Sequence, residues 1–204
     1  MNKIRKHYIE LKSIKKNTGL IDTLFPGKYR LAPYQACQHA CKYCDGRAER
    51  YYVEGDFEKD IVIRRNLPTL LETELAKRKE FGTVALNSGT ADSYQPVESE
   101  EKIMKRVAEI LFRYNLPASI MTKSSLIMRD IDLWQQLHEK AGVTLMVSLT
   151  FADDQLRKIF EPGVSSVKSR LKVIKEFKAR GMYVGVLAMP FIPFLSDTDE
   201  NIYN

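Results

Sequence analysis

The chain has 204 residues, of which 44% are hydrophobic and 28% are charged, so it can bury a core and lacks the bias of a disordered chain. Its 10 glycines and 8 prolines exclude collagen-like and linker-like sequences. No apolar run approaches the roughly 18 residues of a membrane span, and residues 1–16 lack the apolar stretch of a secretory signal. We therefore expect one globular, cytoplasmic domain without a membrane segment.

The formal net charge of +6 is confined to the N-terminal part of the chain. Residues 1–30 carry eight Lys and Arg against two Asp and Glu, whereas the other 174 residues carry 24 of each sign. A basic leader can bind phosphate backbones, but solvated terminal arms are common and this one contains few aromatic residues. We predict a basic N-terminal extension over residues 1–28 and a core domain over 29–204, with nucleic acid the less favoured partner on charge alone.

The expected secondary structure alternates strands and helices. The predicted strands are the apolar runs 29–34, 83–87, 118–122, 143–149 and 182–189. The predicted helices are 68–80, 99–114 with Ser99 as its cap, 129–141 and 166–180. Gly82, Asn115, Gly142 and Gly181 each stand between a helix and the next strand, where helices commonly end.

Repeated βα units of this kind build a parallel sheet, either closed as a barrel or open and doubly wound. The pattern alone does not choose between the two. After the fifth strand, residues 196–200 have the cap and acidic first turn of another helix, and the sequence ends soon afterwards at Asn204. We expect a fold that is incomplete at its C-terminus, either because the chain is a fragment or because a partner or a flexible tail completes the sheet.

The three cysteines, Cys37, Cys41 and Cys44, lie within the eight residues CQHACKYC. An odd number of cysteines so close together is not a disulfide framework, and metal or cluster ligation becomes the leading interpretation. Zinc and cubane iron–sulfur sites usually take four protein ligands, so three thiolates leave one position open. His39 could complete a zinc site, although it lies only two positions from two of the cysteines and simultaneous chelation would be strained. A [4Fe-4S] cluster with one free iron fits the count better.

This CxxxCxΦC loop, with Tyr43 before the last cysteine, resembles the hallmark of the radical S-adenosylmethionine (SAM) enzymes. From Pro33 onward the chain is similar to the spore photoproduct lyase branch of that family. The motifs that carry this resemblance are CKYCDGR at 41–47, SGTADSYQP at 88–96, TKS at 122–124, RDID at 129–132 and EPG at 161–163. Each motif is weak alone, but their number and order make a specific match.

The resemblance implies a partial (βα)6 TIM-like barrel, truncated here after the fifth strand. It implies an enzyme in which a [4Fe-4S] cluster cleaves SAM reductively to a 5′-deoxyadenosyl radical that abstracts hydrogen from a substrate. Nucleic acid is the first candidate substrate, and a ferredoxin or flavodoxin is the expected electron donor. The alternative is a non-catalytic zinc- or iron–sulfur-binding module.

The resemblance also assigns roles to individual residues at the carboxyl ends of the strands. Cys37, Cys41 and Cys44 would hold the cluster. The residues implied to contact SAM are Tyr43 and Ala188 at the adenine, Ser88, Gly89 and Thr90 at the amino group, Lys123 at the carboxylate, and Ser148 at the ribose or carboxylate. The residues implied to face the substrate cavity are Asp92, Tyr94 and Gln95.

Several of these residues also have a purely structural interpretation. Residues 88–90 could be a plain turn, Lys123 a solvated strand end and Ser148 a buried hydroxyl. Glu161 and Arg170 could equally form a surface pair or contact SAM.

The chain departs from its branch at Asn87. Spore photoproduct lyase is thought to carry a further cysteine there as a hydrogen-atom donor, and this sequence has no fourth cysteine. Hydrogen would then return from a tyrosine or from 5′-deoxyadenosine, or the substrate is a different one.

Overall fold

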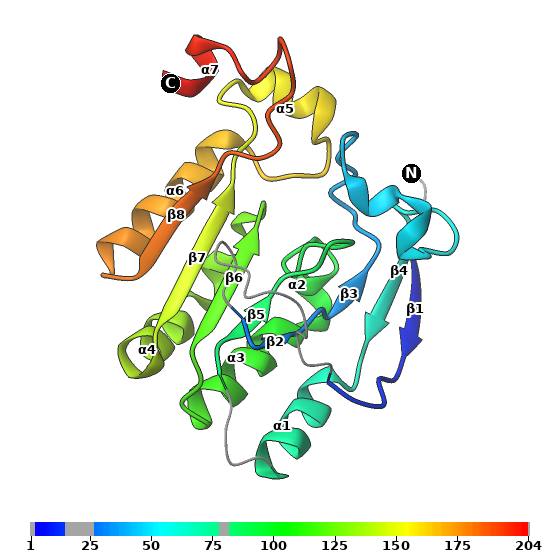
Figure 1. Ribbon diagram of the computed structural model, residues 1–204, viewed down its shortest axis with the longest axis vertical. Coiled ribbons are helices and arrows are strands. Elements are labelled where there is room, and N and C mark those ends of the chain that lie inside the picture. Colours follow the sequence, from blue (N-terminus) through cyan, green and yellow to red (C-terminus); the bar gives the residue numbers. More distant parts are fainter. Residues whose placement is uncertain (1–2, 15–26, 78–81, 204) are drawn as a thin grey trace.

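The computed structural model describes residues 3–14, 27–77 and 82–203 (Figure 1). The strands are β1 (Arg5–Ile9), β2 (Tyr29–Arg30), β3 (Tyr34–Gln35), β4 (Asp60–Arg64), β5 (Val84–Leu86), β6 (Ala118–Thr122), β7 (Val143–Ser148) and β8 (Tyr183–Leu187). The α-helices are α1 (Leu67–Lys77), α2 (Glu98–Glu101), α3 (Ile103–Arg113), α4 (Ile131–Ala141), α5 (Asp154–Phe160), α6 (Val167–Ala179) and α7 (Asp199–Tyr203). Three short 3-10 helices are η1 (Asp45–Arg47), η2 (Glu49–Tyr51) and η3 (Ser125–Asp130).

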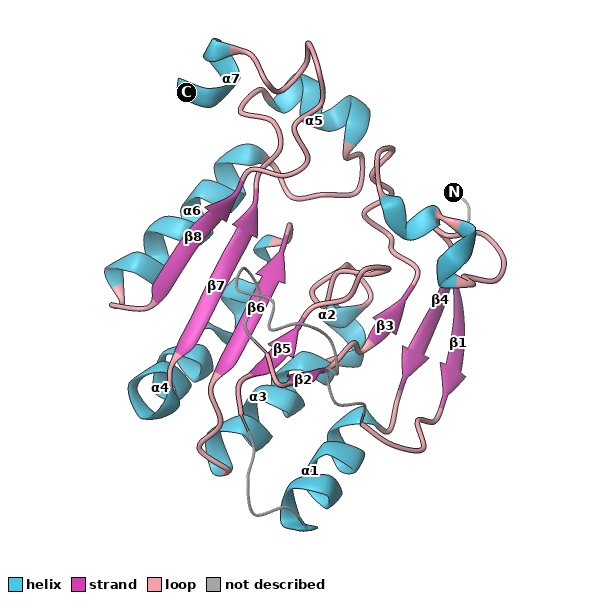
Figure 2. Cartoon of the chain, in the orientation of Figure 1, coloured by secondary structure: helices cyan, strands magenta, loops and turns pink. Residues whose placement is uncertain are grey.

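The strands form two sheets (Figure 2). The main sheet has the order β2-β5-β6-β7-β8, and every neighbouring pair in it is parallel. The smaller sheet has the order β1-β4-β3, in which β1 is parallel and β3 antiparallel to β4. Helix α4 packs against β7, and α6 packs against β7 and β8. The predicted α/β class with a parallel sheet is confirmed.

The predicted helix ends agree with the backbone. Gly142 and Gly181 follow α4 and α6 with φ of 96° and 77°, and Asn115 follows α3 with φ of 56°. Left-handed conformations of this kind terminate helices. The Ser166 side chain accepts a hydrogen bond from the Ser169 amide and caps α6. These signals are local, which is why the sequence carries them.

The helix predicted over 99–114 is two helices, because the chain breaks at Lys102, whose φ is 51°. The predicted cap at Ser99 is wrong, since Ser99 lies inside α2 and its hydroxyl donates to the Pro96 carbonyl. The Glu98 carboxylate takes the capping role at α3 instead and accepts from the amides of Ile103 and Met104, each at 3.0 Å. A buried carboxylate at this helix start satisfies donors that would otherwise lack a partner.

Two other predicted elements differ from the structure. The strand expected over 29–34 divides into β2 and β3, which lie in different sheets, and Pro33 between them has no amide hydrogen for a ladder. The Arg64 guanidinium spans this break by donating to the Ala32 carbonyl at 2.7 Å. The first residues of the helix predicted over 129–141 belong to η3, and α4 begins at Ile131. Residues 78–80 of the first predicted helix lie outside the described residues.

Part of the predicted N-terminal extension is a strand. β1 pairs with β4 along its whole length, and the Arg5 guanidinium contacts the Asp60 carboxylate at 2.5 Å. Lys6 forms an ion pair of 2.7 Å with Glu100. Residues 5–9 are therefore a strand paired with β4 and not a free arm, although four of the five remain exposed to solvent, as expected. Residues 15–26 lie outside the described part.

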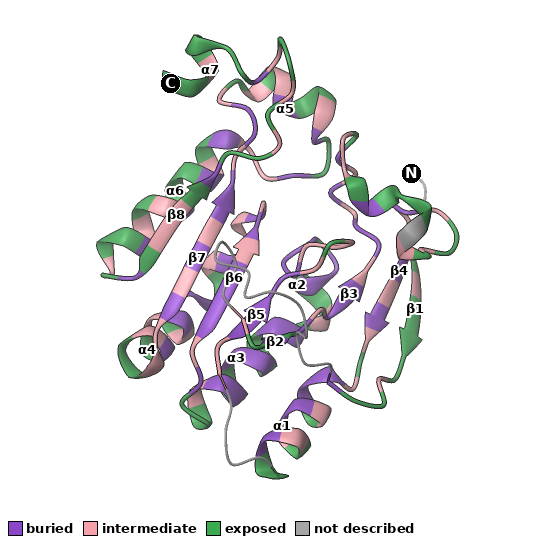
Figure 3. Ribbon diagram, in the orientation of Figure 1, coloured by how far each residue is buried: buried purple, intermediate pink, exposed green. Residues whose placement is uncertain are grey.

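Burial follows the layers of the fold (Figure 3). The strands β5, β6 and β7 and the inward sides of α3 and α4 are buried, with Trp134 of α4 at 0% exposure. β8 is the outer strand of the main sheet, and its Tyr183 and Val186 are exposed. Within the described residues, the helices are all too short or too polar to cross a bilayer.

Candidate functional site

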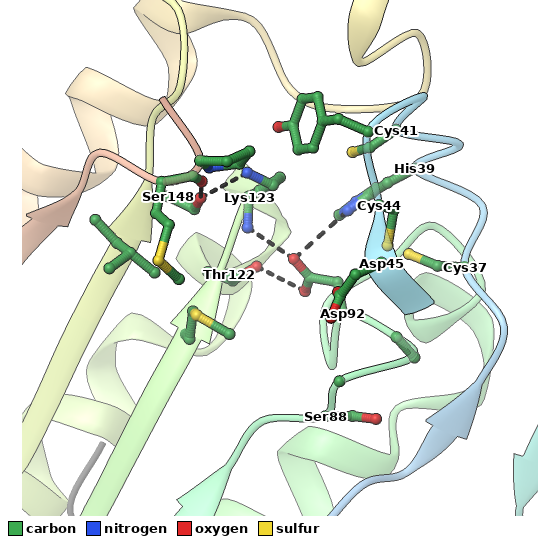
Figure 4. A pocket seen from close by; sticks show the side chains of 17 residues that line it. Cys37, His39, Cys41, Cys44, Asp45, Ser88, Asp92, Thr122, Lys123 and Ser148 are labelled. Atoms are coloured by element: carbon green, nitrogen blue, oxygen red, sulfur yellow. Dashed lines mark hydrogen bonds and ion pairs between the residues drawn. The ribbon is translucent and has the colours of Figure 1, made fainter. Parts of the chain in front are cut away.

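A cavity of about 430 Å³ lies at the carboxyl ends of the main-sheet strands, where parallel sheets commonly bind ligands. Figure 4 shows the cysteine loop on one wall, Lys123 and Ser148 on the opposite wall, and Asp92 between them. The lining residues are Cys37, His39, Cys41, Tyr43, Cys44, Asp45, Ser88, Gly89, Ala91, Asp92, Met121, Thr122, Lys123, Ser148, Leu187, Met189 and Pro190.

The segment after β5 forms hydrogen bonds with the cysteine loop and fixes its position. The Gln95 side chain accepts from the Gln38 amide at 2.9 Å and donates to the Ala36 carbonyl at 3.0 Å. The Gln38 side chain in turn accepts from the Val97 amide at 2.6 Å. Gln95 is fully buried, so the prediction that it faces the cavity is wrong. Its role is to fix the conformation of the loop.

Two glycines allow the cysteine loop to approach its neighbours. A Cβ on Gly163 would lie 2.2 Å from the Gln38 carbonyl oxygen, and a Cβ on Gly46 would lie 2.7 Å from the Gly89 carbonyl oxygen. Both distances are shorter than any side chain tolerates. The glycines of the EPG and DGR motifs are therefore required where these segments pack against the site.

The three thiols face one cavity but are poorly solvated. Burial raises the pKa of Cys41 to about 12 and also raises the pKa values of Cys37 and Cys44. Ligation by such thiols releases their protons to the solvent.

The described residues include no three His, Cys, Asp or Glu side chains that converge on a single-ion site. A cubane cluster spreads its cysteine ligands over separate irons and needs no such convergence. Three thiols on one buried loop beside a cavity therefore suit a [4Fe-4S] cluster.

The opposite wall carries a positive charge. The Lys123 ammonium lies 2.5 Å from the Ser148 hydroxyl oxygen and 3.3 Å from a Glu161 carboxylate oxygen. It also lies 5.4 Å from the centroid of the Tyr43 ring. Tyr43, Lys123 and Ser148, three of the seven residues predicted to contact SAM, line the cavity.

Glu161 and Arg170 form a buried ion pair of 2.8 Å behind this wall, and both side chains are fully buried. The surface pair considered from the sequence is therefore wrong. Arg170 also donates to the Ser148 carbonyl at 2.7 Å, and the Tyr43 hydroxyl donates to the Glu161 carboxylate. Burial alone would raise the pKa of Glu161, but the charges of Lys123 and Arg170 lower it below its ordinary value.

Asp92 lines the cavity, as predicted, and ties three segments together. Its carboxylate accepts from the Thr122 hydroxyl at 2.8 Å, and from the amides of Lys123 and Tyr94 at 2.7 Å each. The His39 ring nitrogen lies 3.5 Å from it on the other side. Burial is the main cause of the lowered pKa of His39.

Some predicted site residues lie elsewhere. Tyr94 is fully buried, with its hydroxyl bonded to Asp130 and Trp134, so the prediction that it faces the cavity is wrong. Ser88 and Gly89 line the cavity, whereas Thr90 does not and places its hydroxyl 3.2 Å from that of Ser88. Ala188 follows β8, is exposed, and is absent from the lining, where its two neighbours in sequence stand instead.

The sequence reasoning assigned no cavity role to several residues. These lining residues are Asp45, Ala91, Met121, Thr122, Leu187, Met189 and Pro190. Their positions, at or within a few residues of the carboxyl end of a strand or, for Asp45, next to Cys44, are the signal that could have indicated them. Asn87, which stands where the branch has its additional cysteine, is buried and is not among the lining residues.

Relatives of the chain agree on one family. A sequence model of the Radical SAM superfamily matches residues 31–204. An uncharacterized protein of Mycobacterium tuberculosis is 32% identical over 87% of this chain and 53% of its own length. One of Methanocaldococcus jannaschii is 29% identical over 94% of this chain and 71% of its own length. The chain thus spans about half the length of the mycobacterial relative.

Solved structures share the fold. Spore photoproduct lyase complexed with dinucleoside spore photoproduct has a TM-score of 0.67 and 15% identity over 92% of this chain and 52% of that one. A mutant of that enzyme with bound AdoMet and the dinucleoside has a TM-score of 0.63 and 17% identity over 91% of this chain and 51% of that one. Sequence identities this low show a similar fold and nothing further. The family match, by contrast, covers the cavity and its cysteines, so the chain belongs to the radical SAM superfamily, whose [4Fe-4S] cluster and S-adenosylmethionine are its cofactors.

Proposed function

We propose that this chain is an enzyme that uses a [4Fe-4S] cluster held by Cys37, Cys41 and Cys44 to cleave SAM reductively. The resulting 5′-deoxyadenosyl radical abstracts a hydrogen atom from a substrate. One observation carries the proposal. A single cavity has three cysteine thiols on one side and the Lys123 ammonium with the Ser148 hydroxyl on the other. Three cysteines leave one iron of a cubane for a ligand other than protein.

The cationic wall suits the amino-acid end of SAM. Lys123 would pair with the carboxylate as a point charge, and the Ser148 hydroxyl would donate a hydrogen bond beside it. Glu161 supports this arrangement, since one of its carboxylate oxygens lies 3.3 Å from the Lys123 ammonium and accepts a hydrogen bond from the Tyr43 hydroxyl. With its hydroxyl held there, Tyr43 would offer its ring face to the adenine.

The remaining contacts follow the ends of β5 and β8. Ser88 and Gly89 would hold the SAM amino group through a hydroxyl and a close backbone approach. Thr90, which does not line the cavity, would orient the Ser88 hydroxyl through its amide. The Ala188 backbone would form a hydrogen bond with the adenine of SAM. Its neighbours Leu187 and Met189 line the cavity and would provide apolar contacts.

We expect the fold to be a partial (βα)6 barrel. Strand β8 is an outer strand of the main sheet in the described part, so the sheet there is not closed. Its electron would come from a low-potential donor such as a ferredoxin or flavodoxin. A nucleic acid remains the first candidate substrate because spore photoproduct lyase, which shares the fold, is solved in complex with a dinucleoside. The net charge of +6 alone does not favour it. The ion pairs of Arg5 and Lys6 with acidic residues reduce the charge available for such contacts.

Anaerobic reconstitution tests the proposed function. Treatment with iron and sulfide is expected to give a brown protein that releases 5′-deoxyadenosine when dithionite and SAM are added. The Cys41→Ala variant is expected to lose the cluster and the product together. A colourless protein holding one zinc per chain would instead support the metal-binding module.

A further inference from the structure

Asp92 stands between the cluster loop and the end of β6 (Figure 4). Its carboxylate has three hydrogen-bond donors within 2.8 Å, two of them from Thr122 and Lys123. Only 9% of the side chain is exposed. These donors satisfy the hydrogen-bonding capacity of the buried carboxylate and fix its position.

Asp92 also lies next to the cysteine loop. It lines the same cavity as Cys37, Cys41 and Cys44, and its carboxylate lies 3.5 Å from the ring of His39, which belongs to that loop. The Asp92 carboxylate also acts electrostatically on Cys37 and Cys41, because its charge is one cause of their raised pKa values. The residue is therefore close to two of the three cluster ligands.

A second carboxylate offers a natural comparison. Asp45 also lines the cavity, next to Cys44, but its side chain is exposed to solvent. Water and salt screen an exposed charge far more strongly than a buried one. Reduction potentials of iron–sulfur clusters depend on nearby charge, on hydrogen bonds to the sulfurs and on exposure.

We infer that the buried Asp92 carboxylate lowers the midpoint potential of the [4Fe-4S] cluster, an inference that rests on the proposed function. Reduction adds one electron to the cluster, and a fixed negative charge beside Cys37 opposes that addition. A cluster with a lower potential is a stronger reductant toward the sulfonium group of SAM. Asp92 would thus tune the electron transfer without itself reacting.

The test is a dithionite titration of the reconstituted protein without SAM, followed by electron paramagnetic resonance. Iron and sulfide content is measured first. Asp92→Asn, which removes the charge and keeps the shape, is expected to shift the midpoint potential to a more positive value. Asp45→Asn is expected to shift it less. Equal shifts, or no shift in Asp92→Asn, would overturn the inference.

Thr122→Val separates charge from mere loosening of the loop. This variant keeps the Asp92 carboxylate but removes its hydroxyl donor, so the charge is less neutralised and the potential should become more negative. A structural disturbance would instead move both variants in the same direction. If Asp92→Asn holds no cluster, the sign for Thr122→Val decides alone, and a positive shift or none rejects the inference. A wild-type protein that assembles no cluster contradicts the proposed function instead.

Discussion

Two buried glutamates have similar partners and stand in different parts of the molecule. Glu161, behind the cavity, contacts Arg170 and the Tyr43 hydroxyl. Glu98, in the core, contacts Arg129 at 2.7 Å and the Tyr34 hydroxyl. Both carboxylates are fully buried.

The two sites differ in charge balance and in what their partners face. Glu161 has a second cation, Lys123, and its pKa is lowered despite burial, whereas burial raises the pKa of Glu98. Two partners of Glu161, Lys123 and Tyr43, line the cavity. Glu98 instead accepts hydrogen bonds from the first amides of α3. A buried glutamate therefore positions cavity residues in one place, at Glu161, and caps a helix in the other, at Glu98.

The largest effect is expected from Arg170→Leu, which leaves Glu161 with fewer cationic partners. Removing one partner of a buried ion pair typically costs about 3–5 kcal/mol of unfolding free energy. Urea denaturation followed by circular dichroism measures this loss. Arg180→Leu is the matched control, since Arg180 pairs with the exposed Asp132 and should cost about 0–1 kcal/mol. Similar losses in both variants would contradict the account.

Glu98→Gln is expected to lower the unfolding free energy by about 1–3 kcal/mol, because the amide nitrogen cannot accept the hydrogen bond that a carboxylate oxygen takes from an α3 amide, and a buried donor is left unsatisfied. The SAM dissociation constant should not change, because neither Glu98 nor the start of α3 lines the cavity. Calorimetric titration of the reconstituted variant checks this. A large loss of SAM affinity would erase the distinction between the two glutamates.

Lys123→Ala is expected to weaken SAM binding about tenfold, equivalent to about 1.4 kcal/mol, while the cluster content stays at the wild-type level. The reason is the loss of the one lysine on the cavity wall among the described residues. Equilibrium dialysis with labelled SAM and iron analysis measure the two quantities. Unchanged affinity would remove Lys123 from the proposed site.

The smallest effect is a difference in acid sensitivity between the two glutamates. The folded pKa of Glu161 is lowered from its ordinary 4.5, so its stabilisation is present above that value and is lost as the pH falls through the folded pKa. The folded pKa of Glu98 is raised, so its contribution is full below 4.5 and declines as the pH rises.

Unfolding free energies of wild type, Glu161→Gln and Glu98→Gln, measured across pH 3–7, test this. The wild-type advantage over Glu161→Gln should grow with pH, and that over Glu98→Gln should shrink. Parallel curves for the two variants would show that the two sites do not differ in charge balance.

Local signals explain what the sequence could predict. The spacing of Cys37, Cys41 and Cys44, the helix end at Gly142 and the cap at Ser166 each depend on residues close in the chain. Lys123 lines the cavity because it directly follows a parallel strand, a position that the sequence shows, while its contact with SAM stays a prediction.

Long-range contacts explain what the sequence could not predict. β1 and β4 are more than fifty residues apart in the sequence, and nothing in either short segment indicates that the two strands pair. Tyr94 and Gln95 lie two and three residues after Asp92, yet their side chains are buried in the core, where they bond to Trp134 and Ala36. The resemblance supplied the motif but not the direction of each side chain.

The central claim is that three cysteines leave one iron open and that SAM occupies it. The direct measurement is the electron paramagnetic resonance spectrum of the reconstituted, dithionite-reduced protein before and after addition of SAM. We predict that SAM changes the signal of the reduced cluster, since it becomes a ligand of that iron. A cluster signal that SAM leaves unaltered, with a side chain of this chain as the fourth ligand, would contradict the account.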